Sequence, residues 1–221
     1  MESEAGFVCG VLCGSGHISI GSNGNYSISL ETKSKDMAVI FREKLHKVMS
    51  KQPKLCGYDK LYKNKRHAAY LVSVYGKKTI LKFADKYSFR KSPARQWKVP
   101  GQAFKNRRFR IGFLRGFFDS KGTIIIRIKS RKSGIDKTPR KTFKTRNIRV
   151  ASTNKRGLEQ VRELLELEGI KSMLYRAGRC FVLDIEGKTR LALFGDKINF
   201  SIPSKRKKLE MAVSYKKMTS S

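Results

Sequence analysis

The sequence has few acidic residues for its length, and this scarcity limits the kind of partner the protein can have. Its 221 residues include 17 Asp and Glu against 50 Lys and Arg, a formal net charge of +33. An excess of this size, spread over the whole chain, favours a polyanion as partner over an ordinary solvated surface. No apolar run approaches the ~18 residues of a membrane-spanning helix, so we expect no membrane partner.

Cysteine is also scarce, and the spacing of the cysteines has no pattern typical of a metal site or a disulfide scaffold. The four cysteines, Cys9, Cys13, Cys56 and Cys180, form no CxxC pair. We therefore expect buried, reduced thiols rather than a disulfide scaffold or a zinc site. The chain begins Met-Glu-Ser-Glu, without the basic region of a secretory signal. An intracellular, cytoplasmic protein is expected, and an organelle remains open.

Two stretches 106 residues apart look like copies of one helix ending. Residues 6–16 read GFVCGVLCGSG and residues 112–122 read GFLRGFFDSKG, with Gly at matching positions and a closing Gly before a strand. A second pair, residues 76–89 and 187–200, is identical at six of fourteen positions. Two such matches in the same order indicate an internal duplication.

Both halves are predicted to have the same order of elements. Hydrophobic periodicity and turn residues predict the following ranges: helix 4–14, strands in 17–32 around an Asn-Gly turn, helix 36–50, strands 55–62 and 68–75, and helix 77–88; then helix 109–120, strands 122–130 and 145–152, helix 154–168, strands 171–177 and 180–186, helix 188–198 and an extra helix 204–214. The fold class is therefore α/β (α+β), with two pseudo-symmetric αββαββα repeats at 1–89 and 107–221 and a linker at 90–106.

The strands alternate between an apolar and a polar side. Ile28 and Leu30 are predicted to share one face, with Ser29 and Glu31 on the other. Helices would cover the apolar faces and leave two polar, partly basic antiparallel sheet faces open. A curved antiparallel sheet of this kind suits a DNA groove, because a two-stranded ribbon fits the major groove.

The paired motif helices resemble the signature of the LAGLIDADG homing endonucleases. The resemblance implies that the two helices pack against each other at the repeat interface, and that their ends reach two neighbouring scissile phosphates. Five mid-helix glycines (Gly6, Gly10, Gly14, Gly112 and Gly116) would allow that close approach, although each costs ~1 kcal/mol relative to Ala in a helix. In the family, an acid just before the closing Gly of each motif holds a divalent cation such as Mg²⁺.

In this chain the two family acids are replaced. Matched position by position, they fall on Ser15 and Lys121. The resemblance places the metal site at Gly14, Ser15, Ser120 and Lys121, but a Lys ammonium ~4 Å from a dication would be repelled by roughly 8 kcal/mol at an effective dielectric of 20. We therefore predict binding retained and cleavage impaired or lost. Secondary catalytic positions carried over from the family are Thr32, Lys33, Ser152 and Asn154; for Asn154 a helix N-cap is the simpler interpretation.

DNA contacts are predicted from the open strand faces and from two Lys/Arg-rich hairpin tips. In the first half the candidates are His17, Ser19, Ser27, Ser29, Glu31, Lys60, Tyr62, Lys63, Lys65, Arg66 and Ser73. In the second half they are Arg127, Lys129, Arg131, Lys132, Arg140, Lys141, Lys144, Arg146 and Arg149. Strand residues would contact bases, and the tips would contact phosphates.

The expected function is thus recognition of a long, asymmetric double-stranded DNA site by a monomer without an obligatory protein partner. A first alternative is an active, intron-encoded endonuclease that uses Mg²⁺ with other acids, such as Glu31, Asp36 or Asp119. A second alternative is an RNA-binding maturase, which the charge alone would permit.

Overall fold

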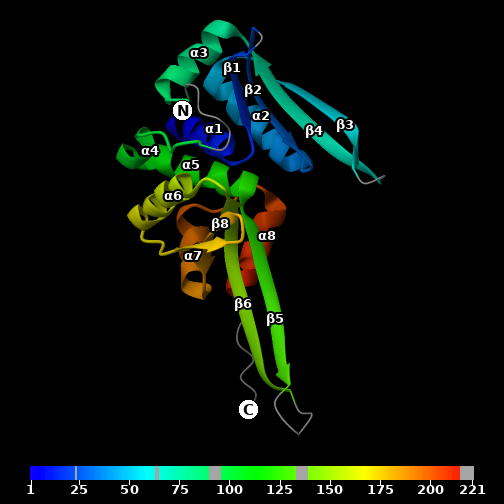
Figure 1. The fold of residues 1–221 in the computed structure, drawn as a ribbon, viewed down its shortest axis with the longest axis vertical. Coiled ribbons are helices and arrows are strands. Elements are labelled where there is room, and N and C mark those ends of the chain that lie inside the picture. The colour runs from blue at the N-terminus through cyan, green and yellow to red at the C-terminus, as the bar shows by residue number, and fades with distance from the viewer. Residues whose placement is uncertain (23, 63–64, 90–95, 133–138, 215–221) are drawn as a thin grey trace.

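The computed structural model describes residues 1–22, 24–62, 65–89, 96–132 and 139–214, without the side chains of residues 22, 62, 65, 128–132 and 139–144. The chain forms two four-stranded antiparallel sheets with helices on one side of each (Figure 1). The first sheet has the order β1-β2-β4-β3 and the second β5-β6-β8-β7, so both halves follow one topology. The predicted α/β fold class, with two αββαββα repeats, is confirmed.

The bounds of the elements agree closely with the sequence periodicity. The first half contains α1 (Glu2–Gly14), β1 (His17–Ser22), β2 (Asn25–Thr32), α2 (Lys35–Met49), β3 (Lys54–Tyr62), β4 (Lys65–Tyr75) and α3 (Lys77–Lys86). The second half contains α4 (Gln102–Lys105), α5 (Arg107–Lys121), β5 (Thr123–Lys132), β6 (Pro139–Ser152), α6 (Lys155–Leu167), β7 (Met173–Ala177), β8 (Cys180–Glu186), α7 (Lys188–Lys197) and α8 (Pro203–Ser214). The largest difference is β6, which begins at residue 139 rather than 145 and makes the β5–β6 hairpin long.

Side-chain caps fix where several helices begin. The Ser34 hydroxyl accepts the Met37 N–H at the start of α2, and the Asn154 side chain accepts the Gly157 N–H at the start of α6. Each cap satisfies a backbone donor that has no partner inside the helix. In α2, Met37, Phe41 and Leu45 then fall on one buried face.

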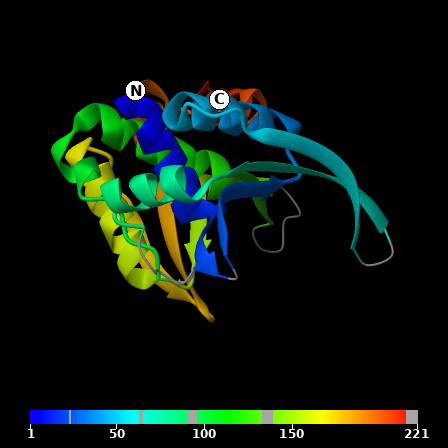
Figure 2. The same ribbon diagram turned by 90° about the horizontal axis from the view of Figure 1, so that it is seen from above.

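Helices α1 and α5 lie side by side between the two sheets, as Figures 1 and 2 show from two directions. A Cβ added to Gly10 would lie 2.0 Å from the Phe113 carbonyl oxygen, and one added to Gly116 would lie 2.1 Å from that of Phe7. Only glycine lets the two backbones approach so closely. Buried residues from both repeats form one continuous core around this contact.

The predicted linker contains more structure than its composition suggests. Trp97 and Val99 are buried, and the short helix α4 lies just before α5. The Trp97 carbonyl accepts a hydrogen bond from Asn154 Nδ2 at 2.6 Å, and the Val99 N–H donates to the Gln160 side chain at 3.0 Å. This segment therefore packs on α6 of the second repeat.

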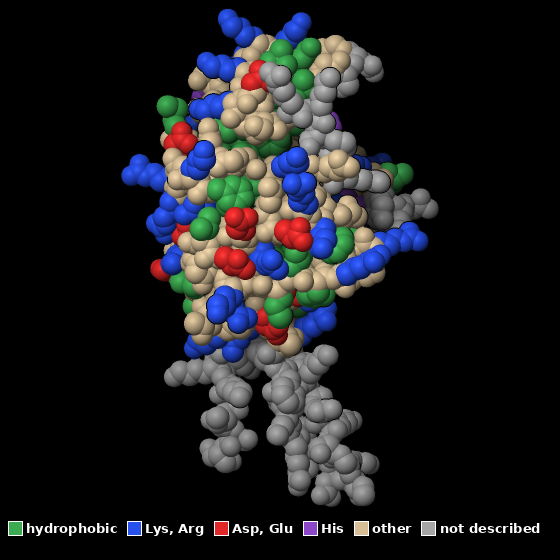
Figure 3. Space-filling view, turned by 60° about the vertical axis from the view of Figure 1, so that its left-hand side comes forward, with side chains coloured by type: hydrophobic (Ala, Val, Ile, Leu, Met, Phe, Trp, Pro, Cys, Tyr) green, Lys and Arg blue, Asp and Glu red, His purple; other side chains and the backbone are tan. Residues whose placement is uncertain are grey.

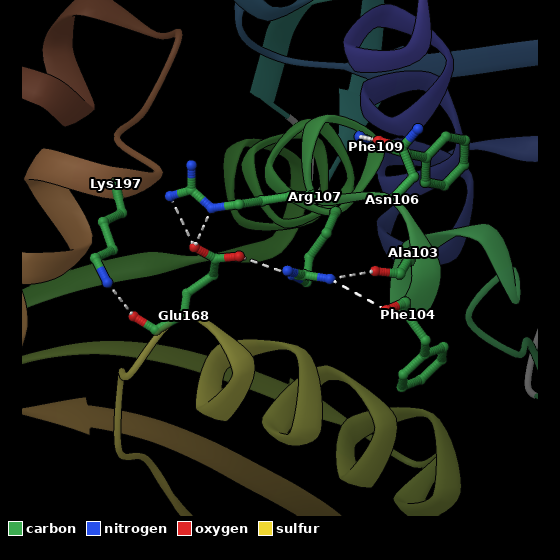
Figure 4. A network of polar contacts seen from close by, with 8 residues as sticks. Ala103, Phe104, Asn106, Arg107, Phe109, Glu168 and Lys197 are labelled. Atoms are coloured by element: carbon green, nitrogen blue, oxygen red, sulfur yellow. Dashed lines mark hydrogen bonds and ion pairs between the residues drawn. The ribbon is translucent and has the colours of Figure 1, made fainter.

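A polar network around the buried residue Glu168, at the end of α6, connects helices α4, α5 and α7 at the N-terminal end of α5. Glu168, only 2% exposed, accepts hydrogen bonds from Arg107 Nε at 3.1 Å and from Arg110 Nε at 2.7 Å. Lys197 donates to the Glu168 carbonyl at 2.8 Å (Figure 4). Arg110 also donates to the Ala103 carbonyl at 3.1 Å. The network fixes α4, α5 and α7 around the end of α6.

The cysteines only partly follow the prediction of buried thiols. Cys9 and Cys13 are buried in α1, and burial raises both pKa values. Cys56 is exposed and Cys180 is half-buried, because their strands β3 and β8 carry them toward open surface. In the described part of the chain, all four thiols are free and no helix is long and apolar enough to cross a membrane.

Candidate nucleic-acid interface

The C-terminal ends of α1 and α5 bring together the four residues at which the sequence predicts a metal site. Ser15 Oγ donates to the Ser120 carbonyl at 3.2 Å, and Lys121 Nζ donates to the Gly14 carbonyl at 3.3 Å. Each side chain thus contacts the last turn of the opposite helix. Helix C-termini carry about half a negative charge each, so an ammonium is favoured between them.

The donors at this point do not suit a divalent cation. The groups there are two peptide carbonyls, the two neutral hydroxyls of Ser15 and Ser120, and one ammonium, whereas Mg²⁺ and Ca²⁺ sites in proteins are built around carboxylates. Nowhere in the described ranges do three His, Cys, Asp or Glu residues gather in a way that could hold a metal ion. The predicted metal positions are therefore adjacent, but their chemistry does not fit the metal.

Asp119, the nearest acid along α5, already has a structural role. It is 2% exposed, and its two carboxylate oxygens accept the Ser201 N–H at 2.9 and 3.2 Å. Burial raises the pKa of this carboxyl. Asp119 lies beside Ser15 in a shared pocket, but its carboxylate ties α5 to the segment before α8.

Lys205 of α8 completes this corner, and the sequence analysis missed it. Its ammonium donates to the carbonyls of Phe118, Asp119 and Gly122 at 3.1, 2.6 and 2.7 Å. These carbonyls lie at the C-terminal end of α5, where that of Phe118 also accepts the Gly122 N–H, so Lys205 caps that helix. Burial lowers its pKa to about 8. Nothing in the local sequence distinguishes this lysine from its neighbours in α8.

The secondary catalytic candidates separate into two groups. Thr32 and Lys33 line a pocket of about 320 Å³ together with Ser15 and Ser120, so the fold brings them to the helix ends. Ser152 Oγ accepts the Asn154 N–H at 3.1 Å, as Thr32 Oγ1 accepts the Ser34 N–H at 3.1 Å, but Ser152 does not line that pocket. Asn154 uses both ends of its amide, for the α6 cap and for the Trp97 carbonyl, which supports the N-cap interpretation.

The open face of the first sheet is only partly accessible. His17 and Glu31 are exposed and Ser29 is half-buried, but Ser19, Ser27 and Ser73 are 8%, 6% and 6% exposed. These three hydroxyls are therefore little exposed in the free protein, and their contact with DNA stays a prediction. Ser27 and Ser73 lie on the central strands β2 and β4, where they pair with the longer side chains of Tyr75 and Lys54, respectively, whereas Ser19 lies on the edge strand β1 opposite Ser27.

Charged residues at the edge of this face pair with each other. Lys60 Nζ lies 2.5 Å from Glu31 Oε1, and both side chains are about half exposed. The hydrogen bonds from Lys60 and Tyr58 hold the pKa of Glu31 below its usual value. Arg66 is exposed. Glu31 is thus engaged with a lysine that the sequence assigned to DNA.

The open face of the second sheet carries a polar network around Asp184. Asn147, Arg149 and Tyr175 all donate to its carboxylate. Arg127 is exposed on the same face. Arg146 is a correction, because it points to the helix-covered side and donates to the Ala212 carbonyl of α8 at 2.8 Å. Its even position in β6, shared with Ile148, explains this orientation.

Several predicted contacts with DNA lie beyond the described atoms. Lys63 lies outside the described residues, and the following side chains are not described: Tyr62, Lys65, Lys129, Arg131, Lys132, Arg140, Lys141 and Lys144. On the face in Figure 3, Lys and Arg are interspersed with a group of Asp and Glu near the middle. Positive charge is therefore not continuous over this face.

Comparisons with known proteins identify the fold. Residues 108–199 match the family model described as a LAGLIDADG-like domain. I-DmoI in complex with DNA and Ca is similar at 17% identity and a TM-score of 0.59, over 95% of this chain and 98% of that one. The homing endonuclease I-WcaI bound to its DNA recognition sequence is similar at 13% identity and a TM-score of 0.63, over 95% and 86%.

A third similar structure is full-length DUF199/WhiA from Thermatoga maritima, at 15% identity and a TM-score of 0.58. It covers 100% of this chain and 62% of that protein. No curated protein sequence matches the chain. Together, the structural matches establish the fold of the chain, and the family model matches residues 108–199 within its second half.

Proposed function

We propose that this chain, which has the LAGLIDADG homing endonuclease fold, binds a long, asymmetric double-stranded DNA site as a monomer and cleaves it weakly or not at all. The net charge of +33 and the two open sheet faces support DNA as the partner. I-DmoI and I-WcaI have this fold and are bound to DNA in their structures. The two halves carry different side chains, which favours an asymmetric site over a palindrome.

The proposal that cleavage is lost rests on the residues at the two helix ends, where Ser15 and Lys121 occupy the positions of the family acids. In hydrolysis of a phosphodiester, metal ions held by carboxylates activate water and stabilise the leaving oxygen. Here Lys121 Nζ contacts the Gly14 carbonyl and Ser15 Oγ contacts the Ser120 carbonyl. The Lys121 ammonium favours binding because it can neutralise a phosphate, but neither Lys121 nor Ser15 supplies the carboxylate that would hold a metal ion.

An active enzyme using other acids is the less favoured function. Asp119 is buried and accepts the Ser201 N–H, and Glu31 is paired with Lys60. Asp36 lies in the first turn of α2, where an acid stabilises the helix N-terminus. Among the described residues, none of these three carboxylates belongs to a group of three or more His, Cys, Asp or Glu that could hold a metal ion.

The first experiment selects bound duplexes from a random pool of double-stranded DNA. Enrichment of one long asymmetric sequence is expected, with affinity that falls steeply as salt increases, because many phosphates are neutralised. Structured intron RNA serves as competitor. Failure to enrich any duplex, or stronger binding of the RNA, would refute DNA recognition and favour the maturase alternative.

The second experiment uses the selected duplex with Mg²⁺. The unaltered chain is expected to leave both strands intact, and Ser15→Asp combined with Lys121→Glu should introduce cleavage. Each single substitution is the matched control and should restore at most nicking. Efficient double-strand cleavage by the unaltered chain would overturn the proposed loss of activity.

A further inference from the structure

The strongest unassigned feature is a buried carboxylate at the centre of an otherwise open sheet face. Asp184 of β8 is 3% exposed although it lies on the face away from the helices. It accepts hydrogen bonds from Asn147 Nδ2 at 2.7 Å, from Tyr175 Oη at 2.7 Å and from Arg149 Nη2 at 2.7 Å. A charge so enclosed needs several donors, and these side chains supply them.

Asp184 holds the guanidinium of Arg149 along one edge. Arg149 Nε lies 3.0 Å from Oδ1, and Nη2 lies 2.7 Å from Oδ2, which makes a two-point contact. Nη2 also lies 3.0 Å from Tyr175 Oη. The paired contact removes the rotational freedom of a long side chain, so little entropy remains to be lost when Arg149 binds a ligand.

One end of this guanidinium remains available. Arg149 Nη1 makes no hydrogen bond to any residue that the structure describes, and the side chain is 37% exposed. It borders a hollow of about 310 Å³, whose lining includes Arg127, Thr145 and Tyr175. The N–H groups of Nη1 are therefore free to meet an acceptor that enters from the open face.

We propose that Arg149, positioned by Asp184 and Tyr175, reads a guanine in the major groove of the bound DNA. Guanine presents two acceptors there, O6 and N7, and an arginine is their commonest specific partner. A phosphate contact would not need a guanidinium held in one orientation. A phosphate can be approached from many directions, so a mobile cation is enough to contact it. The inference rests on the proposed function of DNA binding, and it adds which base is recognised at one position of the DNA site.

The first repeat has no arginine held by a carboxylate at the corresponding pair of strand positions. In the second sheet, Arg149 pairs with Asp184 across β6 and β8. The corresponding pair across β2 and β4 is Ser29 with Ser73. Two short hydroxyl side chains cannot present a fixed guanidinium, so the guanine preference should occur in only one half of the DNA site. This difference also gives the asymmetry of the site a physical origin.

The test repeats the selection from random duplex DNA with Arg149→Lys and Asp184→Asn. Lysine keeps the charge but loses the planar fork, and asparagine removes the charge that holds Arg149. Both variants should lose preference for guanine at the same single position, by about tenfold, and retain the rest of the selected sequence. Arg156→Ala, an exposed change of charge on α6, is the control and should leave every position unchanged.

Thermal unfolding of each variant separates folding from recognition, and Arg149→Lys remains informative if Asp184→Asn is unstable. An unchanged base profile in Arg149→Lys would overturn the inference, as would a uniform loss of affinity at all positions. Enrichment of guanine at the symmetry-related position in the other half-site would also contradict it. If the unaltered chain enriches no sequence, the proposed function itself fails, which is a distinct outcome.

Discussion

The ammonium of Lys121 lies 3.3 Å from the carbonyl oxygen of Gly14, on the opposite helix. The contact crosses the interface between α1 and α5 at the point where both helices end. It places a fixed positive charge between two partial negative charges of the helix termini. The fold brings this ammonium next to Ser15 and Ser120, where it offsets the partial negative charge of both helix ends.

Binding of DNA should be independent of divalent cations. The affinity of the unaltered chain for its selected duplex is expected to be the same in EDTA and in Mg²⁺ at equal ionic strength. Lys121→Met should weaken binding by about tenfold, because a charged hydrogen-bonding group is lost. Fluorescence anisotropy at constant ionic strength measures both effects, and a large loss of affinity in EDTA would contradict the prediction.

Alanine at the helix interface should destabilise the protein, although it favours an isolated helix. A Cβ on Gly10 would lie 2.0 Å from the Phe113 carbonyl oxygen, so the helices must separate. Gly10→Ala is expected to lower the free energy of unfolding by 3 kcal/mol or more, at or beyond the usual range for overpacking, ~1–3 kcal/mol. Gly101→Ala is the control, since a Cβ there meets nothing within 4 Å. Urea unfolding of both variants measures the difference in stability. Equal unfolding midpoints for Gly10→Ala and Gly101→Ala would count against the close contact between α1 and α5.

Removal of the buried acid at the other end of α5 should be costly. Glu168→Ala leaves Arg110, whose side chain is 11% exposed, without its carboxylate. The free energy of unfolding is expected to fall by about 3–5 kcal/mol, the usual effect of stranding a buried charge. Glu166→Ala breaks an exposed pair with Arg162 and should cost less than about 1 kcal/mol. Chemical denaturation compares the two variants, and similar losses would refute the assigned role of Glu168.

The Lys205 cap predicts that stability rises in mild alkali. Its pKa is about 8 in the folded state, lowered by burial from a reference of 10.5. Between these values the unfolded chain holds a proton that the folded chain has released, so the free energy of unfolding increases with pH. The gain should reach up to about 3 kcal/mol between pH 8 and 10.5 relative to Lys205→Met. Unfolding measured from pH 7 to 10.5 tests this, and parallel curves for the two proteins would exclude the depressed pKa.

The order of elements could be predicted from the sequence because each depends on local pattern. The alternation in residues 25–32 predicted which side chains of β2 face the core, and the register confirms that Ile28 and Leu30 are buried together. The glycine spacing of the two motifs similarly predicted the close helix pair. Such patterns survive folding because a helix or strand repeats its geometry every few residues.

The site was less predictable where the relevant partners are distant in sequence. Ser19, Ser27 and Ser73 have the right parity for the open face but are buried, and Ser27 and Ser73 pair with the longer side chains of Tyr75 and Lys54 on adjacent strands. Arg146 was assigned to DNA from the charge of its hairpin, although its side chain bonds to α8. Neither outcome can be derived from one strand, because accessibility depends on which strands and helices become neighbours.

The sequence by itself determined the duplication, the excess of positive charge, and the presence of Ser15 and Lys121 just before the closing glycines of the two motifs. Only the tertiary structure decided what these two side chains contact, namely carbonyls of the opposite helix, 105 or more positions away in the chain. It also decided that Asp184 fixes Arg149 and that Lys205 caps α5. The physical reason is that residue type and local period are encoded along the chain, whereas hydrogen bonds between distant side chains exist only after the backbones have packed.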